Sequence, residues 1–370
     1  MAYPRDVPIR STDDLGGVGC SLMGQRVVIG VLGETPLEAI EQHAALEPMA
    51  VPVPAAHEVV IAIASAAVGW VDLIMASGQY QHVPKPPYTP GLEYAGTIAH
   101  AGAESGFTEG ERVMLDPFLA GPRSHGDYQR AGGFATHALV PAAAVRRIPG
   151  TLTFDQACNL LGNYETAYHC LIARGHLAAG ETVLIHGASG STGLAAVHLA
   201  KLVGARVIAT GRSPAKLEAV KAEGADHVMS STGFRDEVKA LTEGRGVDVV
   251  YDAVGGEISL ESLRCVRFGA RFLIVGWAST PFVARGKVAA NHLPTNLIMM
   301  KGLDVLGCPA VISAVNDPAM RDARVAQLLM WVEAGRIQPH VSRVFPLVEF
   351  KDALRAKWKG EIVGGCVLRP

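Results

Sequence analysis

A glycine-rich turn between an apolar run and a segment rich in Ala and Leu is the feature that most constrains the fold of this chain. The run Thr182–His186 leads into Gly187-Ala-Ser-Gly-Ser-Thr-Gly193, and apolar residues at helical spacing follow over 194–203. This order predicts a strand, a tight turn and a helix. Small residues let the backbone approach a phosphate, and the free N–H groups of a helix N-terminus favour an anion. The turn therefore predicts either a phosphate-binding site or an ordinary strand-to-helix connection.

A second β-branched run at 206–210 follows the predicted helix and completes a β-α-β unit. In proteins that bind NAD, an acidic residue about 20 positions beyond the glycines holds the ribose 2′-hydroxyl. The corresponding place here is Thr210-Gly211-Arg212, which holds no carboxylate, and Lys216 follows it. Since Arg212 and Lys216 can pair with a 2′-phosphate, the pattern indicates NADP(H). The alternative is that both are ordinary solvated charges at the start of a helix.

Composition excludes several classes of function. The chain has 370 residues, of which 49% are hydrophobic and 18% charged, and its net charge of −2 gives no basic field for nucleic acid or an anionic membrane. The uncharged apolar run at 59–68 is too short to span a bilayer, and no signal peptide is visible. The six cysteines include no C-x-x-C pair, so we expect no metal and a reducing, cytoplasmic setting.

The periodicity of the sequence changes along the chain and predicts its domains. Residues 1–26, rich in Pro, Gly, Asp and Ser, are expected to form an arm with little structure of its own. Short β runs separated by turns over 27–157 predict a partly open β-barrel. Alternating β and α patterns over 158–315, including a helix at 258–267, predict a doubly wound parallel sheet. The β runs of 316–370 are expected to return to the barrel domain.

The order of these parts resembles the medium-chain dehydrogenase/reductase superfamily over nearly the whole chain after residue 26. Within it, the nearest likeness is to the zinc-independent quinone oxidoreductases and their enoyl-reductase relatives. The resemblance implies a GroES-like barrel domain joined to a Rossmann domain, an α/β fold. The segments that carry it are 76–80, 90–96, 132–140, 165–168, 187–193, 247–256 and 296–301.

The resemblance also concerns the catalytic metal. Zinc alcohol dehydrogenases of this superfamily hold zinc with Cys, His and Cys, and the matching positions here are Gly69, Leu92 and Gly162. None of these side chains can bind zinc, and a catalytic zinc usually needs three protein ligands. The resemblance therefore implies hydride transfer without a metal.

The resemblance implies that NADPH lies with its pyrophosphate on residues 189–193 and its nicotinamide facing a cleft between the domains. The 2′-phosphate would meet Gly211, Arg212 and Lys216, and Thr166 and the segment 276–279 would border the nicotinamide. The cofactor-binding residues implied are Thr166, Gly187, Ala188, Ser189, Gly190, Ser191, Thr192, Gly193, Gly211, Arg212, Lys216, Val254, Gly276 and Trp277.

Tyr80 is the candidate catalytic residue, because it matches the tyrosine that enoyl-thioester reductases place near the substrate. A neutral phenol can donate a hydrogen bond to the enolate oxygen that forms when hydride reaches the substrate. The alternative is that Tyr80 only forms a wall of the pocket.

Position 69 departs from the family pattern, because many quinone oxidoreductases have Asn there and this chain has Gly69-Trp-Val-Asp72. The missing amide removes a polar group that could orient a carbonyl, and Trp70 adds a large ring. We therefore expect a less polar substrate pocket containing Trp70 and Asp72, unless Asn163 supplies the missing amide. Asp72 is either catalytic or a helix cap or ion-pair partner.

These features lead to one functional prediction and one alternative. The prediction is a zinc-free, NADPH-dependent reductase of a quinone or of the β-carbon of an α,β-unsaturated carbonyl, such as an enone or an enoyl thioester. The alternative is a non-catalytic regulatory protein of the same fold that binds NADPH. By resemblance we also expect a homodimer that pairs through the apolar segment 302–312.

Overall fold

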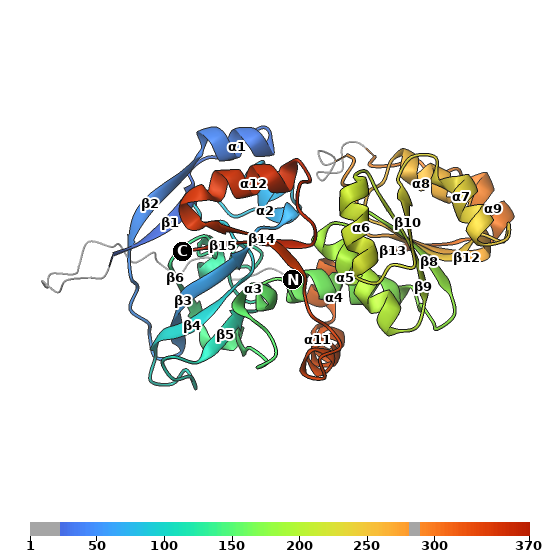
Figure 1. Cartoon of the computed structure of the whole chain (residues 1–370). Helices are drawn as coiled ribbons and strands as arrows, with labels where there is room; N and C mark the ends of the chain where they lie inside the picture. The colour runs from blue at the N-terminus through green and yellow to red at the C-terminus, as the bar shows by residue number, and fades with distance from the viewer. Residues whose placement is uncertain (1–22, 281–288) are drawn as a thin grey trace, which may run out of the picture.

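The computed structural model describes residues 23–280 and 289–370, and places two large sheets side by side (Figure 1). The predicted arm lies outside the described residues except for its last four, which begin strand β1 (Met23–Ile29). Among the helices of these described residues, none combines the length and apolarity needed to cross a lipid bilayer.

The first sheet forms the GroES-like domain. Seven strands make it up, in the order β14-β15-β3-β4-β5-β7 with β6 paired to β3, and β1 pairs separately with β2. The chain returns to this sheet at its C-terminal end, because β15 pairs antiparallel with β3. The elements are β2 (Ala44–Ala50), β3 (Glu58–Ala67), β4 (Tyr94–Ala101), β5 (Arg112–Leu115), β6 (His137–Pro141), β7 (Val145–Arg147), β14 (Val341–Pro346) and β15 (Gly365–Arg369), with helices α1 (Pro36–Gln42), α2 (Trp70–Ala76) and α12 (Phe350–Trp358) and short 3-10 turns at Asp127–Arg130, Ala142–Ala144 and Leu347–Glu349.

The second sheet is the parallel, doubly wound sheet of a Rossmann domain, with strand order β10-β9-β8-β11-β12-β13. The order reverses between β8 and β11, which is where such sheets bind their ligands. The elements are β8 (Thr182–His186), α5 (Ser191–Leu202), β9 (Arg206–Gly211), α6 (Pro214–Ala222), β10 (His227–Ser230), α7 (Phe234–Leu241), β11 (Val247–Asp252), α8 (Glu257–Ser262), β12 (Val266–Ile274), α9 (Thr295–Lys301) and β13 (Asp304–Gly307).

Strand β8 shows why the sequence builds a three-layer domain. All five of its residues are buried, and alternate residues face opposite layers. Val183 and Ile185 pack in the cluster that includes α5, whereas Leu184 packs in the cluster that includes Phe234 of α7. Helices therefore cover both faces of the sheet, as the sequence predicted.

One predicted helix differs from the structure. The helix expected over 258–267 ends at Ser262, because Val266 already pairs with Val247 as the start of β12. Gly269, at φ +67°, then interrupts that strand in a conformation that a helix cannot contain. The helical segment before β8 is divided into α3 (Phe154–Ala157), α4 (Leu161–Tyr168) and a π-helix at His169–Arg174.

A buried group of charges joins the two domains. Helix α10 (Ala310–Asn316) is followed by α11 (Pro318–Glu333), which carries Arg321. Arg321 donates hydrogen bonds to Asp116 at 2.8 and 2.9 Å and to Glu165 of α4 at 2.8 and 3.0 Å. Arg324 bonds Glu165 at 2.9 Å. All four side chains are buried, so the network sets how α4 and α11 pack against the end of β5.

Candidate functional site

The glycine-rich turn connects β8 to α5 and has the backbone that a phosphate site needs. Gly187 has a φ of +66°, in the left-handed region that favours glycine. A Cβ at position 193 would lie 2.3 Å from the carbonyl oxygen of Gly187, so no other residue fits there. Gly190 caps α5 without a side chain, which leaves the N–H groups of the first turn open to a ligand. These features fit a dinucleotide pyrophosphate.

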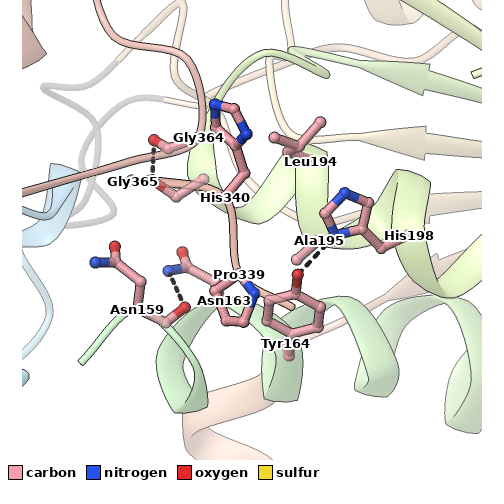
Figure 2. A pocket seen from close by; sticks show the side chains of 11 residues that line it. Asn159, Asn163, Tyr164, Leu194, Ala195, His198, Pro339, His340, Gly364 and Gly365 are labelled. Carbon is pink, nitrogen blue, oxygen red and sulfur yellow. Dashed lines mark hydrogen bonds between the residues drawn. The ribbon is translucent and has the colours of Figure 1, made fainter. Parts of the chain in front are cut away.

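The C-terminal part of the chain packs against this turn. Gly364 donates its N–H to the carbonyl of Ser189 at 2.9 Å and accepts a hydrogen bond from the Ser191 hydroxyl at 2.7 Å. Figure 2 shows His340, Gly364 and Gly365 above a small pocket that α5 and the α3–α4 segment also line. Ala188 is buried at the start of the turn. The GroES-like domain thus contacts the predicted cofactor turn directly.

The two candidate cations for a 2′-phosphate stand at the end of β9. Thr210 is buried and bonds His186, whereas Gly211 is partly buried and Arg212 is exposed. Lys216, in the first turn of α6, donates to the carbonyl oxygen of Gly360. Among the described residues no carboxylate forms an ion pair with Arg212 or Lys216, so the donor set fits a phosphate.

The residues expected near the nicotinamide meet at the ends of β11 and β12. The amide of Val254 bonds the Asp252 carboxylate at 2.9 Å, and the amide of Gly276 bonds the Asp252 carbonyl at 3.2 Å. The Val254 side chain faces Gly187, where an added Cβ would lie 3.3 Å from it. Trp277 is 40% exposed. The structure therefore places Val254 beside the glycine-rich turn, and Gly276 and Trp277 beside the segment 252–255.

Positions 69, 92 and 162, which the resemblance matches to the zinc ligands of alcohol dehydrogenases, lie around two carboxyl groups. The Asp72 carboxylate accepts the amides of Gly69 at 2.9 Å and Leu92 at 3.2 Å. The Glu93 carboxylate accepts the amide of Gly162 at 2.6 Å, and a Cβ at position 162 would lie 2.3 Å from Glu93 Oε2. Within the part of the chain that the structure describes, no group of three or more His, Cys, Asp or Glu could hold a metal ion.

Burial raises the pKa of both carboxyl groups above the usual value for Asp and Glu. It raises the pKa of Asp72 to about 6 and the pKa of Glu93 to about 7, although Arg123 lowers both. The Nε of Arg123 is buried without a hydrogen-bond partner, and its guanidinium lies 5.5 Å from the Phe118 ring centre. A proton can therefore be held at Glu93 near neutral pH.

The predicted substrate residues have distinct surroundings. Trp70 stacks on Trp358 of α12, with ring centres 5.0 Å apart and planes 9° from parallel. Tyr80 is partly buried against the barrel core, and among the described residues its hydroxyl has no hydrogen-bond partner. Asp72 is buried and caps α2 through Gly69, as its alternative interpretation anticipated.

Asn163 and Thr166 both lie on α4. Asn163 accepts a hydrogen bond from Thr192 at 3.1 Å and donates to the Asn159 carbonyl at 3.0 Å, so its amide joins α4 to α5. The Thr166 hydroxyl donates to the Gly162 carbonyl at 2.7 Å. The polar groups of both side chains are engaged within the protein, and their roles toward substrate and nicotinamide stay predictions.

Sequence reasoning missed Glu93, Arg123 and Lys357. The signal for Glu93 was present, since it follows Leu92 directly in the family segment 90–96. Lys357 carries no local signal, because its partner Ser191 is 166 residues away.

Comparison with known proteins places the chain in a family. Residues 55–150 match the family model "Alcohol dehydrogenase GroES-like domain", and residues 191–321 match "Zinc-binding dehydrogenase". A "Quinone oxidoreductase-like protein 2 homolog" of Nematostella vectensis is 31% identical over 83% of this chain and 81% of its own length. A "Quinone oxidoreductase" of Pongo abelii is 30% identical over 82% of this chain and 86% of its own.

Solved structures agree with the sequence relatives. A "probable oxidoreductase" of Mycobacterium abscessus is 29% identical, covers 94% of this chain and 100% of its own, and superposes with a TM-score of 0.75. Despite the name of one matching family model, the chain has Gly69, Leu92 and Gly162 where the zinc ligands would stand. The chain belongs to the medium-chain dehydrogenase/reductase superfamily, in its quinone oxidoreductase branch.

Proposed function

We propose that the chain is an NADPH-dependent oxidoreductase that works without zinc. It would transfer hydride to a quinone or to the β-carbon of an enone or enoyl thioester. The observation that carries the proposal is the pair Arg212 and Lys216 at the end of β9, where no carboxylate opposes a 2′-phosphate. The glycines at positions 69 and 162 support the metal-free part, because neither has a side chain that could bind zinc.

The chain's own residues would bind and orient the cofactor. The N–H groups at the start of α5 would hold the pyrophosphate, and Arg212 and Lys216 the 2′-phosphate. Thr166, Val254, Gly276 and Trp277 would border the nicotinamide. When bound, NADPH supplies the hydride.

The substrate would lie near Tyr80, Trp70 and Asp72. Hydride addition to an enone leaves negative charge on the carbonyl oxygen, and this charge needs a hydrogen-bond donor. The Tyr80 hydroxyl could provide one, since it has no hydrogen-bond partner within residues 23–280 and 289–370. The Trp70 ring, held in place by Trp358, would form an apolar wall.

Binding constants for both nicotinamide cofactors test the proposal. We expect the double variant Arg212→Ala/Lys216→Ala to lose at least about tenfold in affinity for NADPH and little for NADH, because each lost charge-assisted hydrogen bond contributes about 1.5–3 kcal/mol. Lys221→Ala, an exposed position later in α6, is the matched control. Unchanged NADPH affinity would mean that the 2′-phosphate is held elsewhere. A chelator should leave turnover unaffected.

A non-catalytic, NADPH-binding regulatory protein is the second candidate. Position 69 favours it, since Gly replaces an amide that could orient a substrate carbonyl. A screen of quinones, enones and enoyl thioesters distinguishes the two candidates, because only the enzyme consumes NADPH.

We also propose a homodimer through segment 302–312. Strand β13 is the outermost strand of its sheet, and Ile312, at 47% exposure, lies beyond it. A second β13 could extend the sheet across a two-fold axis. Light scattering should give twice the chain mass of 38.9 kDa, and Ile312→Lys should shift it toward the monomer.

A further inference from the structure

Three cationic side chains from distant parts of the chain converge near the glycine-rich turn. The ammonium group of Lys357, in α12, donates to the Ser191 hydroxyl at 2.8 Å and lies 3.5 Å from the Gly364 carbonyl oxygen. Lys216 bonds the carbonyl of Gly360, and the Arg212 guanidinium would lie 3.1 Å from a Cβ at that glycine. The loop between α12 and β15 thus gathers cations of both domains.

These cations have only neutral hydrogen-bond partners. Among the described residues, no Asp or Glu forms an ion pair with Arg212, Lys216 or Lys357, and the bonds of Lys216 and Lys357 go to a hydroxyl and to backbone carbonyls. Burial lowers the pKa of Lys357, although Cys366 and Asp72 raise it, and burial together with Arg212 and Lys357 lowers the pKa of Lys216. Like charges that form no ion pair with a carboxylate are stabilised by an anion.

The position of Lys357 indicates which part of the cofactor it would bind. Ser191 is the first residue of α5, so Lys357 stands where helix N–H groups would meet a pyrophosphate. Arg212 and Lys216 follow β9, where the adenosine ribose would lie. We propose that Lys357 is a cofactor-binding residue, and that its ammonium group pairs with the pyrophosphate of the bound dinucleotide.

This inference rests on the proposed function and adds a role for the GroES-like domain in it. Lys357 belongs to α12, and the adjacent Trp358 stacks on Trp70 beside the predicted substrate site. A pyrophosphate paired with Lys357 would be bound by both domains at once. Cofactor binding would therefore hold the two domains together across the cleft.

The test is the affinity of the full chain for NADPH and for NADH, measured by calorimetry or tryptophan fluorescence. We expect Lys357→Met to weaken both by about tenfold and to leave their ratio unchanged, because the pyrophosphate is common to both. Lys357→Arg, which keeps the charge, should restore most of the affinity. Lys359→Met removes an exposed charge two residues away and should bind as the wild type does.

The melting temperature measured without nucleotide shows whether each variant folds. If Lys357→Met does not fold, Lys357→Gln takes its place, because its side chain can still form a hydrogen bond with Ser191. Wild-type affinity for both cofactors in a folded, charge-removed variant would overturn the inference. A loss confined to NADPH would also overturn it, because it would assign Lys357 to the 2′-phosphate. If the wild-type chain binds neither cofactor, the proposed function itself fails.

Discussion

The amide of Gly162 lies 2.6 Å from the carboxylate of Glu93, a residue 69 positions earlier in the chain. Glu93 follows β3 and α2 at the start of β4, whereas Gly162 is in the first turn of α4. The carboxyl group fills the space that a side chain at position 162 would need. Glu93 can therefore occupy this position because residue 162 is a glycine.

Adding a methyl group at position 162 should disturb this contact. A Cβ there would lie 2.3 Å from Glu93 Oε2, so we expect Gly162→Ala to lower the free energy of unfolding by about 1–3 kcal/mol, through overpacking and a weakened hydrogen bond. Urea denaturation measures the change. Gly150→Ala, where a Cβ meets nothing within 4 Å, is the control, and an equal effect at both sites would refute the steric argument.

The elevated pKa of Glu93 predicts how stability depends on pH. Burial raises this pKa from 4.5 to about 7, so between these values the unfolded chain releases the proton while the folded chain keeps it. The contribution of Glu93 to stability is therefore fully present below pH 4.5 and is lost as the pH rises through 7. Glu93→Gln, which cannot ionise, should lack this loss.

The unfolding free energies of wild type and Glu93→Gln, compared from pH 5 to pH 8, test the predicted direction of this pH dependence. The wild type should lose on the order of 2 kcal/mol relative to the variant as the pH rises. A constant difference over this range would mean that Glu93 has an ordinary pKa.

The buried charge network should be sensitive to the loss of one member. Among the described residues, Glu165→Ala leaves Arg324 without a buried acidic partner and Arg321 with Asp116 alone, so we expect a loss of about 3–5 kcal/mol in unfolding free energy. Asp236→Ala breaks the exposed pair with Arg235 and should lower the unfolding free energy far less, because solvent screens that pair. Thermal and urea unfolding distinguish the two, and similar losses would contradict the role assigned to burial.

The variant Tyr80→Phe tests whether the Tyr80 hydroxyl donates a hydrogen bond in the reaction or whether Tyr80 only forms a wall of the pocket. If the hydroxyl stabilises the developing enolate, kcat should fall by about 10²-fold or more, while NADPH affinity and melting temperature stay at wild-type values. The measurement needs an acceptor found in the substrate screen. Unchanged kcat would make Tyr80 a wall of the pocket, and its hydroxyl would have no part in the reaction.

Local patterns account for most of the fold that the sequence predicted. The apolar run of β8, the glycines of the turn and the helical spacing of α5 are adjacent along the chain, so their periods and turn residues predict a β-α-β unit directly. The absence of an acid at Thr210-Gly211-Arg212 is likewise a local observation. The helix predicted over 258–267 was wrong in its second half, since pairing of Val266 with Val247 overrides local propensity.

What the sequence by itself determined is therefore the α/β class, the glycine-rich turn and the lack of zinc ligands at positions 69, 92 and 162. Only the tertiary structure decided that Glu93 faces Gly162, that Trp70 stacks on Trp358 and that Lys357 reaches Ser191. Each of these contacts joins residues 69 to 288 positions apart, where no periodicity or turn signal acts. Such pairs are set by how whole elements pack, because burial and charge are properties of the assembled domains.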